Sequence, residues 1–225
     1  MECGNQMINI VYEDNHLLVV EKPINVPVQA DSSGDIDLLA MLKRYIKDKY
    51  DKKGNVYLGL VHRLDRPVGG IMVFAKTSKC AKRLSKQIFE HKFEKYYYAV
   101  CQGKVPKSGK FLDKLAKDRK KNISYVSSSG KESILFYDLA SYKDGYSLVK
   151  INLKTGRSHQ IRVQFSSRGF PLYGDLKYNI NCKKGQIALF AYKIKFFHPI
   201  TNDLLEFNLE IPDRYPFNIF KSDLL

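Results

Sequence analysis

Hydrophobic residues along this chain occur mostly in short runs or in alternation with polar ones, a pattern typical of β-strands. Runs bounded by polar turns predict strands at residues 8–12, 17–20, 56–60, 71–75, 96–100, 146–153, 187–197 and 205–211. Helical spacing occurs at residues 36–50, after Thr77 or Ser78, and around Gln160-Ile161-Arg162 up to Gly169. Strands outnumber helices and follow one another closely, so we predict an α+β fold with a largely antiparallel mixed sheet and flanking helices and loops.

Charge adds the first indication of a partner. Lys and Arg number 38 against 23 Asp and Glu, a net charge of +15, which favours a polyanion and above all nucleic acid. No apolar run approaches the roughly 18 residues that span a bilayer, and nothing reads as a basic amphipathic anchor. The N-terminus lacks the pattern of a secretory signal, so we expect a cytoplasmic protein.

The 225 residues suit a single domain, 1–225, with two lobes as a variant of that organisation. Residues 104–131 are polar, charged and Ser-rich, which predicts a mobile connection or an arm that contacts RNA phosphates. Four scattered cysteines, Cys3, Cys80, Cys101 and Cys182, form no C-x-x-C pair, which disfavours a zinc site or a disulfide framework.

A polar, Gly-rich loop at residues 62–70 separates two predicted strands and is the first candidate for chemistry. It places Asp65 between Arg63 and Arg66, and its two glycines allow a ligand or another backbone to come close. An ionised carboxylate in this setting suits a nucleophile or a general base. The alternative is that Asp65 is an aspartate in a surface turn that forms an ion pair, since such pairs are common.

A second candidate is the stretch 155–162, in which a Gly turn opens a helix that bears two Arg, a His and a Gln. Ile161 and Phe165 are four residues apart and can anchor this helix to the core, so that Arg162 faces a cleft. The alternative is a solvated cationic helix face.

Three consecutive tyrosines form the third candidate. In a strand, Tyr97 points to the face opposite Tyr96 and Tyr98, so one set is expected to be buried and the other available. Tyrosines in strands are usually packing residues, which is the alternative here.

Several common catalytic motifs are absent from the sequence. There is no G-x-x-x-x-G-K-[ST], G-x-G-x-x-G, H-E-x-x-H or G-x-S-x-G. Their absence disfavours nucleotide hydrolysis, dinucleotide redox chemistry, zinc proteolysis and serine hydrolysis.

Taken together, four ordered motifs resemble those of the RluA-type RNA pseudouridine synthases. They are LVVEKP at 18–23, HRLD at 62–65, KYYYAV at 95–100 and TGRSHQIR at 155–162, and residues 189–212 resemble the closing hairpin of the family. The match spans nearly the whole chain. It covers the catalytic domain and includes no S4-type module, so RNA recognition is expected to rest on that domain's own surface.

The resemblance implies roles for the matching residues. Asp65 corresponds to the aspartate that acts as nucleophile or base, Arg162 to the arginine that pairs with it, and Tyr97 to the tyrosine that stacks on the target base. Arg63 corresponds to the arginine that fills the space left by a flipped nucleotide. Contacts to RNA are also expected from four further residues of these motifs: His62, Arg66, Arg157 and His159.

The implied activity is isomerisation of uridine to pseudouridine in structured RNA, within a central RNA-binding cleft and without metal or cofactor. The uracil must leave the ribose at N1, turn, and rejoin through C5, which calls for a carboxylate, an orienting cation and an aromatic platform. A base inside a duplex must first be flipped out. Ribosomal RNA and transfer RNA both fit as substrates, and a monomer is the expected state.

Two other functions compete with this one. An RNA-binding or RNA-folding factor can share the fold without depending on catalysis, and Asp65→Asn separates the two by its effect on pseudouridine formation. A metal-dependent nuclease is disfavoured because no group of carboxylates is placed to hold metal ions.

Overall fold

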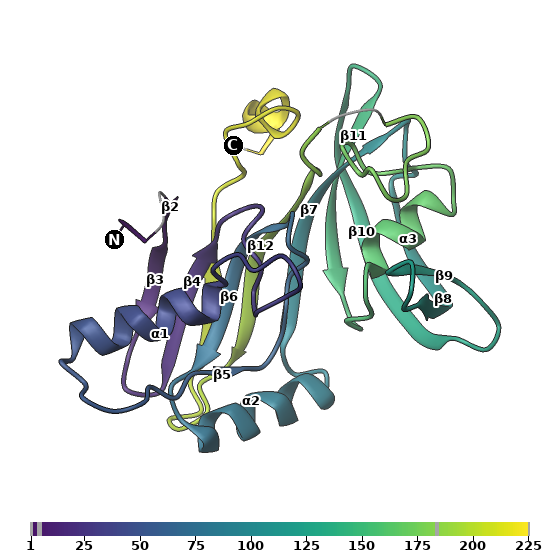
Figure 1. Cartoon of the computed structure of the whole chain (residues 1–225). Helices are drawn as coiled ribbons and strands as arrows, with labels where there is room; N and C mark the ends of the chain where they lie inside the picture. Colours follow the sequence, from purple (N-terminus) through teal and green to yellow (C-terminus); the bar gives the residue numbers. More distant parts are fainter. Residues whose placement is uncertain (1, 4–5, 183–184, 225) are drawn as a thin grey trace. The chain divides into compact units, whose positions relative to one another are not determined.

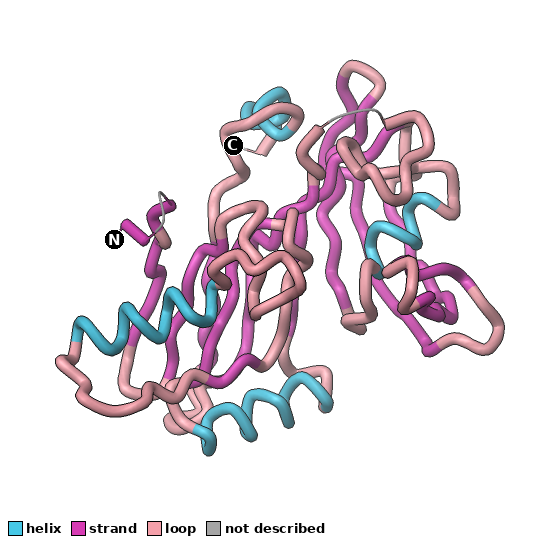
Figure 2. Tube along the Cα trace, viewed as in Figure 1, coloured by secondary structure: helices cyan, strands magenta, loops and turns pink. Residues whose placement is uncertain are grey.

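The computed structural model describes residues 2–3, 6–182 and 185–224 (Figure 1). The chain divides into two compact units: Met1–Glu94 with Lys193–Leu209, and Lys95–Tyr192 with Glu210–Leu225. Both units contain more strands than helices, joined by loops and turns (Figure 2). Strand β12 (Leu189–Phe197) gives its first residues to the second unit and its last residues to the first.

The first unit contains a sheet in which β3 (Asn9–Glu13), β4 (Leu17–Lys22) and β6 (Gly69–Ala75) are consecutive antiparallel neighbours. Every residue of β6 is buried, as expected for an apolar central strand. The other elements of this unit, besides the end of β12, are β1 (Glu2–Cys3), β2 (Gln6–Met7), α1 (Leu38–Lys49), β5 (Gly59–Leu60), α2 (Ser78–Phe89) and β13 (Leu204–Asn208).

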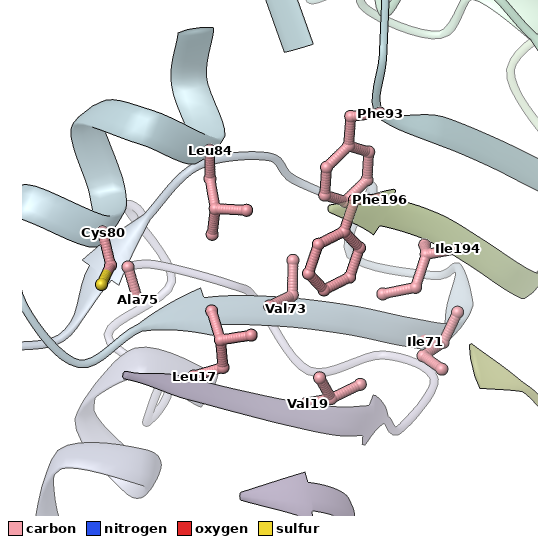
Figure 3. Packing of buried hydrophobic residues seen from close by; sticks show 10 residues of the cluster. All are labelled: Leu17, Val19, Ile71, Val73, Ala75, Cys80, Leu84, Phe93, Ile194 and Phe196. Atoms are coloured by element: carbon pink, nitrogen blue, oxygen red, sulfur yellow. The ribbon is translucent and has the colours of Figure 1, made fainter. Parts of the chain in front are cut away.

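The core of the first unit lies between α2 and one face of the sheet (Figure 3). Alternate residues of β4 and β6 point toward this helix because successive side chains of a strand lie on opposite faces. Phe93 and Phe196 stack within the core, with ring centroids 5.0 Å apart. Each such buried side chain contributes about 1.5–3 kcal/mol. The buried cluster comprises Leu17, Val19, Ile71, Val73, Ala75, Cys80, Leu84, Phe93, Ile194 and Phe196.

Helix α2 begins after Thr77 as the sequence predicts, and α1 begins at Leu38, two residues after the predicted start at residue 36. The Asp37 carboxylate accepts a hydrogen bond from the Ala40 amide at 2.9 Å and caps α1. The Thr77 hydroxyl accepts one from the Cys80 amide at 3.2 Å and caps α2. Such caps are worth about 1 kcal/mol each.

Glu13, at the end of β3, ties α1 to the sheet. Its carboxylate accepts hydrogen bonds from Lys49 Nζ at 2.7 Å and from Tyr45 Oη at 2.8 Å, both on α1. Tyr50 Oη and Lys76 Nζ donate to the other oxygen, each at 2.8 Å. The Glu13 side chain is 7% exposed. A buried charge of this kind is stable because all its partners are donors.

These contacts give the fold a specific dependence on pH. Burial acts to raise the pKa of Glu13, but the hydrogen bonds from Lys49, Lys76 and the two tyrosines outweigh burial and lower the pKa from 4.5 to about 2. Because the folded pKa is depressed, this stabilisation is complete above pH 4.5 and is lost as the pH falls toward 2. Glu13→Gln is therefore expected to lose about 2 kcal/mol of unfolding free energy at pH 7 and less at pH 3. Urea unfolding at both pH values measures this, and an equal loss at both would contradict it.

The second unit contains five strands in antiparallel neighbour pairs. Their order in the sheet is β7 (Glu94–Gln102), β11 (Tyr146–Leu153), β10 (Lys131–Lys143), β8 (Ser108–Asp118) and β9 (Ile123–Val126). Helix α3 (Gln160–Ser166) packs on this sheet through Phe165, whose ring centroid lies 5.0 Å from Phe111 and 5.4 Å from Tyr137. A 3₁₀ helix, Phe217–Asp223, lies near the C-terminus.

The prediction of a mobile connection at residues 104–131 is wrong. This stretch forms β8 and β9, which pair with each other, and β8 pairs with β10 along eight positions from Ser108 to Leu115. Phe111 and Leu115 are buried, whereas Lys110 and Lys114 alternate with them on the exposed face. The strand was missed because its alternating pattern has few apolar residues on the buried face and lysines on the exposed face. β10 was not predicted from the sequence either.

The predicted α+β fold with a largely antiparallel sheet is confirmed by these elements. Ile161 and Phe165 anchor α3 in the core as expected, at 4% and 0% exposure. Cys80 and Cys101 are buried free thiols, and the side chain of Cys3 lies outside the described residues.

Candidate active site

Asp65 lies in the loop between β5 and β6 of the first unit. The loop is anchored by Leu64 and Val68, which are 7% and 1% exposed, while Asp65 between them is half-buried. The Val68 amide donates to the Asp65 carbonyl at 2.9 Å and closes a tight turn. The loop thus presents one carboxylate from a backbone that is fixed on both sides.

Lys22, the last residue of β4, holds this loop from inside. Its Nζ donates to the carbonyls of Pro23 at 2.8 Å, Arg66 at 3.0 Å and Val68 at 2.7 Å. The side chain is 1% exposed, so water does not reach these three carbonyls. The three N–H donors of the Lys22 ammonium group satisfy them instead. Two of these carbonyls belong to the loop that carries Asp65.

The charge of Lys22 is coupled to that of Asp65. Burial lowers the pKa of Lys22 to about 7, the Asp65 carboxylate opposes this shift, and Arg66 adds to it. Lys22 belongs to the LVVEKP motif but was not predicted as a site residue. The signal that could have found it is a lysine at the end of a mostly apolar strand, directly before a proline.

The other polar residues of this loop have different surroundings. His62 Nε2 accepts a hydrogen bond from the Val73 amide at 3.1 Å, and its ring centroid lies 5.4 Å from that of Phe93. Arg63 is exposed. The guanidinium of Arg66 donates to the Asp35 carboxylate, and Arg66 Nε donates to the Asn25 carbonyl at 3.2 Å. His62 therefore supports the strand, whereas Arg63 is exposed to a partner.

In the second unit, the side chain of Gln160 stabilises the turn that precedes α3. Its Oε1 accepts hydrogen bonds from Thr155 Oγ1 at 2.7 Å and from the Arg157 amide at 3.1 Å. Its Nε2 donates to the Ile134 carbonyl and to Gln164 Oε1, each at 3.1 Å. One buried amide thus fixes the motif from Thr155 onward to the edge of β10.

Arg162 projects from α3 and is 5% exposed. Its Nε and Nη2 donate to the two carboxylate oxygens of Asp175 at 2.8 and 2.7 Å, a bidentate ion pair. Asp175 was not predicted as a site residue. The signal available in the sequence was a carboxylate directly after a glycine, because a tight turn often needs a glycine, and Gly174 does adopt a φ of +69°.

Arg157 and His159 precede Arg162 in the same motif. Arg157 is exposed, and its Nε donates to the Glu132 carbonyl at 3.1 Å. His159 has a positive φ of 52° and precedes α3, and its Nδ1 lies 2.7 Å from Tyr178 Oη in a hydrogen bond. Arg157 is available to a partner, whereas one ring nitrogen of His159 is engaged within the fold.

Tyr97 lies in β7 opposite Ile151 of β11 and is 6% exposed. Tyr98, on the other face of the strand, is 9% exposed and stacks on Tyr192 with ring centroids 3.9 Å apart. Tyr96 is half-buried. The expected division into one buried and one available set is therefore wrong, because the second face of the strand is covered as well.

The structure brings Asp65 together with Lys22 in the first unit, and Arg162 together with Asp175 in the second. The pairing of Asp65 with Arg162 stays a prediction. Among the described residues, no three His, Cys, Asp or Glu side chains are grouped so that they could hold a metal ion. No helix in the described part of the chain is long and apolar enough to cross a membrane.

Similarity to known proteins identifies the family of this chain. The RNA pseudouridylate synthase family model matches residues 16–167. A protein of Aquifex aeolicus named uncharacterized RNA pseudouridine synthase is 35% identical over 94% of this chain and 72% of its own length. Ribosomal large subunit pseudouridine synthase D of Haemophilus influenzae is 30% identical over 100% and 74%. Ribosomal large subunit pseudouridine synthase C of Buchnera aphidicola is 36% identical over 84% and 62%.

A solved structure shows the same fold. Human RNA pseudouridylate synthase domain containing 4 superimposes with a TM-score of 0.76 at 22% identity, over 96% of this chain and 90% of that one. The chain belongs to the RluA-type RNA pseudouridine synthase family and is an isomerase that converts uridine in RNA to pseudouridine.

Proposed function

We propose that this enzyme modifies uridine in the RNA of the large ribosomal subunit, as a cytoplasmic monomer, with Asp65 as the reacting carboxylate. Two of its relatives, from Haemophilus and Buchnera, are named for that substrate. The observation that carries the role of Asp65 is its loop: Lys22 fixes two of the loop carbonyls from inside, and Asp65 stays half-buried between two anchored residues. A fixed carboxylate meets the need of the reaction for a positioned nucleophile or base.

Each proposed catalytic residue has one task. The reaction breaks the N1–C1′ bond of uridine and forms a C5–C1′ bond, and the hydrogen on C5 leaves. Asp65 acts at the ribose as nucleophile at C1′ or as base toward the 2′ position, and Arg162 pairs with it. Tyr97 keeps the detached uracil in place by stacking.

RNA contacts surround these residues in the proposal. Arg63 fills the space left by the flipped nucleotide. Arg157 and Arg66 contact phosphates of the RNA backbone. At Arg66 the phosphate competes with the carboxylates of Asp31 and Asp35, which already pair with its guanidinium. His62 and His159 each use one ring nitrogen within the fold, so their contacts to RNA are expected from the remaining ring edge.

Substrate choice is tested with RNA from cells that lack this gene. Large-subunit ribosomal RNA and transfer RNA, each labelled with tritium at uracil C5, are incubated separately with the protein. We expect tritium release from the ribosomal RNA, and release from transfer RNA alone would move the substrate to that class.

RNA affinity is expected to fall steeply with salt. The net charge is +15, and exposed lysines such as Lys110 and Lys114 line β8. If the protein neutralises several phosphates, the dissociation constant rises about 100-fold or more between 50 and 200 mM salt, because condensed counterions are released on binding. Filter binding at a series of salt concentrations measures this, and an affinity that stays flat would contradict it.

Tyr97→Ala is expected to slow pseudouridine formation about 10- to 100-fold, and Tyr97→Phe less than about threefold, because stacking on a base is worth about 1–3 kcal/mol and needs the ring. Single-turnover rates measure both. Tyr98→Ala is the matched control, since Tyr98 is equally buried but faces Tyr192 on the other side of β7. Equal losses for Tyr97→Ala and Tyr97→Phe would assign the role to the hydroxyl.

A further inference from the structure

A turn that follows α3 in the chain holds the side chain of Arg162. The Asn179 amide donates to the Asp175 carbonyl at 2.9 Å and closes this turn, residues 175–179, which we call the Asp175 turn. Asp175 meets Arg162 in a bidentate ion pair, and the two side chains are 0% and 6% exposed. The pair uses Nε and one terminal nitrogen, which fixes the plane of the guanidinium.

The Asp175 side chain is also held by contacts other than the one with Arg162. Its Oδ1 accepts hydrogen bonds from the backbone amides of Lys177 at 3.1 Å and Tyr178 at 3.3 Å. The Asp175 amide donates to the Leu172 carbonyl at 3.3 Å. The orientation of the carboxylate therefore follows from the backbone of its own turn, and Arg162 adopts the direction that the carboxylate sets.

Tyr178 supports Arg162 from a second side. Its ring centroid lies 5.1 Å from the Arg162 guanidinium, within the range of a cation–π contact. Its hydroxyl accepts a hydrogen bond from the Ser124 amide of β9 at 2.8 Å and bonds His159 Nδ1 at 2.7 Å. Ser166 Oγ, at the end of α3, donates to the Tyr178 carbonyl at 2.5 Å. The Asp175 turn is thus tied to both ends of α3 and to β9.

Stability alone is a weak reason for such a pair. A buried ion pair contributes little net stability compared with well-packed apolar residues of the same size, because both charges lose their hydration. A more exposed ion pair lies just beyond the end of α3, between Arg168 and Asp113 of β8, whose side chains are 31% and 13% exposed. Of the two pairs, only the buried one involves a residue of the TGRSHQIR motif, Arg162.

We propose that Asp175 is a positioning residue for pseudouridine formation, with Tyr178 as its second support. The Asp175 turn holds the guanidinium of Arg162 in the one orientation that its pairing with the reacting carboxylate requires. This inference rests on the proposed role of Arg162. It assigns to residues 175–179, which lie outside the four motifs, a part in catalysis through Arg162.

Three variants of the full chain test the proposal. Asp175→Asn removes the charge that holds Arg162, and Tyr178→Phe keeps the ring but removes the hydroxyl. Asp113→Asn, in β8, removes the carboxylate that pairs with Arg168 and is the matched control. Each is compared with the wild type by thermal unfolding, by the dissociation constant for RNA, and by the single-turnover rate at saturating enzyme. The Nε–Hε NMR signal of Arg162 reports its contact with Asp175 independently of activity.

We expect Asp175→Asn to shift the Arg162 Nε–Hε signal and to slow the single-turnover rate about 100-fold, with RNA affinity within about threefold, since a misplaced group can cost that factor. In an Arg162→Ala background, Asp175→Asn is expected to cause no further loss, because it acts through Arg162. The single-turnover rate of Tyr178→Phe is expected to be lower than that of Asp113→Asn. The rate of Asp113→Asn should stay within about twofold of the wild type.

Distinct results overturn the proposal. A folded Asp175→Asn with the rate of Asp113→Asn, or with an unshifted Arg162 signal, contradicts the positioning role. If Asp175→Asn does not fold, Tyr178→Phe decides, and a rate equal to that of Asp113→Asn refutes the role of the turn. A wild type that releases no tritium, with the Arg162 signal still dependent on Asp175, refutes the proposed function and leaves the ion pair as a structural contact.

Discussion

Asp65→Asn is expected to reduce pseudouridine formation about a thousandfold, because loss of a reacting group removes an interaction that the transition state alone requires. Asparagine has nearly the same size and can keep the turn closed by the Val68 amide, which donates to the backbone carbonyl and not to the side chain. RNA affinity should therefore stay within about threefold of the wild type. Nucleoside analysis of RNA after single-turnover reactions measures the rate, and filter binding measures the affinity.

The matched control for this variant is Asp48→Asn. Asp48 is an exposed carboxylate in the same unit and forms a surface pair with Arg44 at 3.7 Å, which is worth little. Its rate should equal that of the wild type. If Asp65→Asn retained most of the activity, Asp65 would not be the reacting carboxylate. If it lost activity and RNA binding together, the residue would act mainly in binding.

Lys22→Met is expected to destabilise the protein by about 3 kcal/mol or more and to loosen the loop that carries Asp65. Methionine can fill the apolar part of the site, but three carbonyls then lose their donor in a place without water, at about 1–3 kcal/mol each. Urea unfolding gives the total loss. Hydrogen exchange at the Val68 amide, which closes the turn at Asp65, reports the loop itself.

Lys49→Met separates this local effect from a general loss of lysine charge. Lys49 bonds Glu13 in the same unit and is 44% exposed, far from full burial. The Lys49→Met variant should have lower stability, but exchange at the Val68 amide should not become faster relative to the amides of β6. Unchanged Val68 exchange in Lys22→Met would show that Lys22 does not hold the loop.

The first unit could be predicted well from the sequence because its strands are dense in apolar residues. β4 and β6 consist almost wholly of residues that are buried, so their runs predict strands directly. The second unit was harder. β8 has exposed lysines on one face and few apolar residues on the other, and its strand character comes from pairing with β10, which no local pattern reveals.

The same distinction applies to the site. The motifs predict Asp65, Tyr97 and Arg162 because each belongs to a local signature. Lys22 and Asp175 were missed because their importance comes from contacts between segments: Lys22 bonds a carbonyl 46 residues away, and Asp175 pairs with an arginine 13 residues before it. The sequence marks these positions only weakly, as a lysine before a proline and an aspartate after a glycine, and it does not show which groups folding places beside them.

The most direct test of the central claim is tritium release from RNA labelled at uracil C5 and taken from cells that lack this gene. Pseudouridine formation must free that hydrogen, because the new bond to ribose forms at C5. The intact protein should release tritium in proportion to the uridines it converts, and Asp65→Ala should release none. Release by both proteins, or by neither when both are folded and bind RNA, would contradict the claim that this chain isomerises uridine through Asp65.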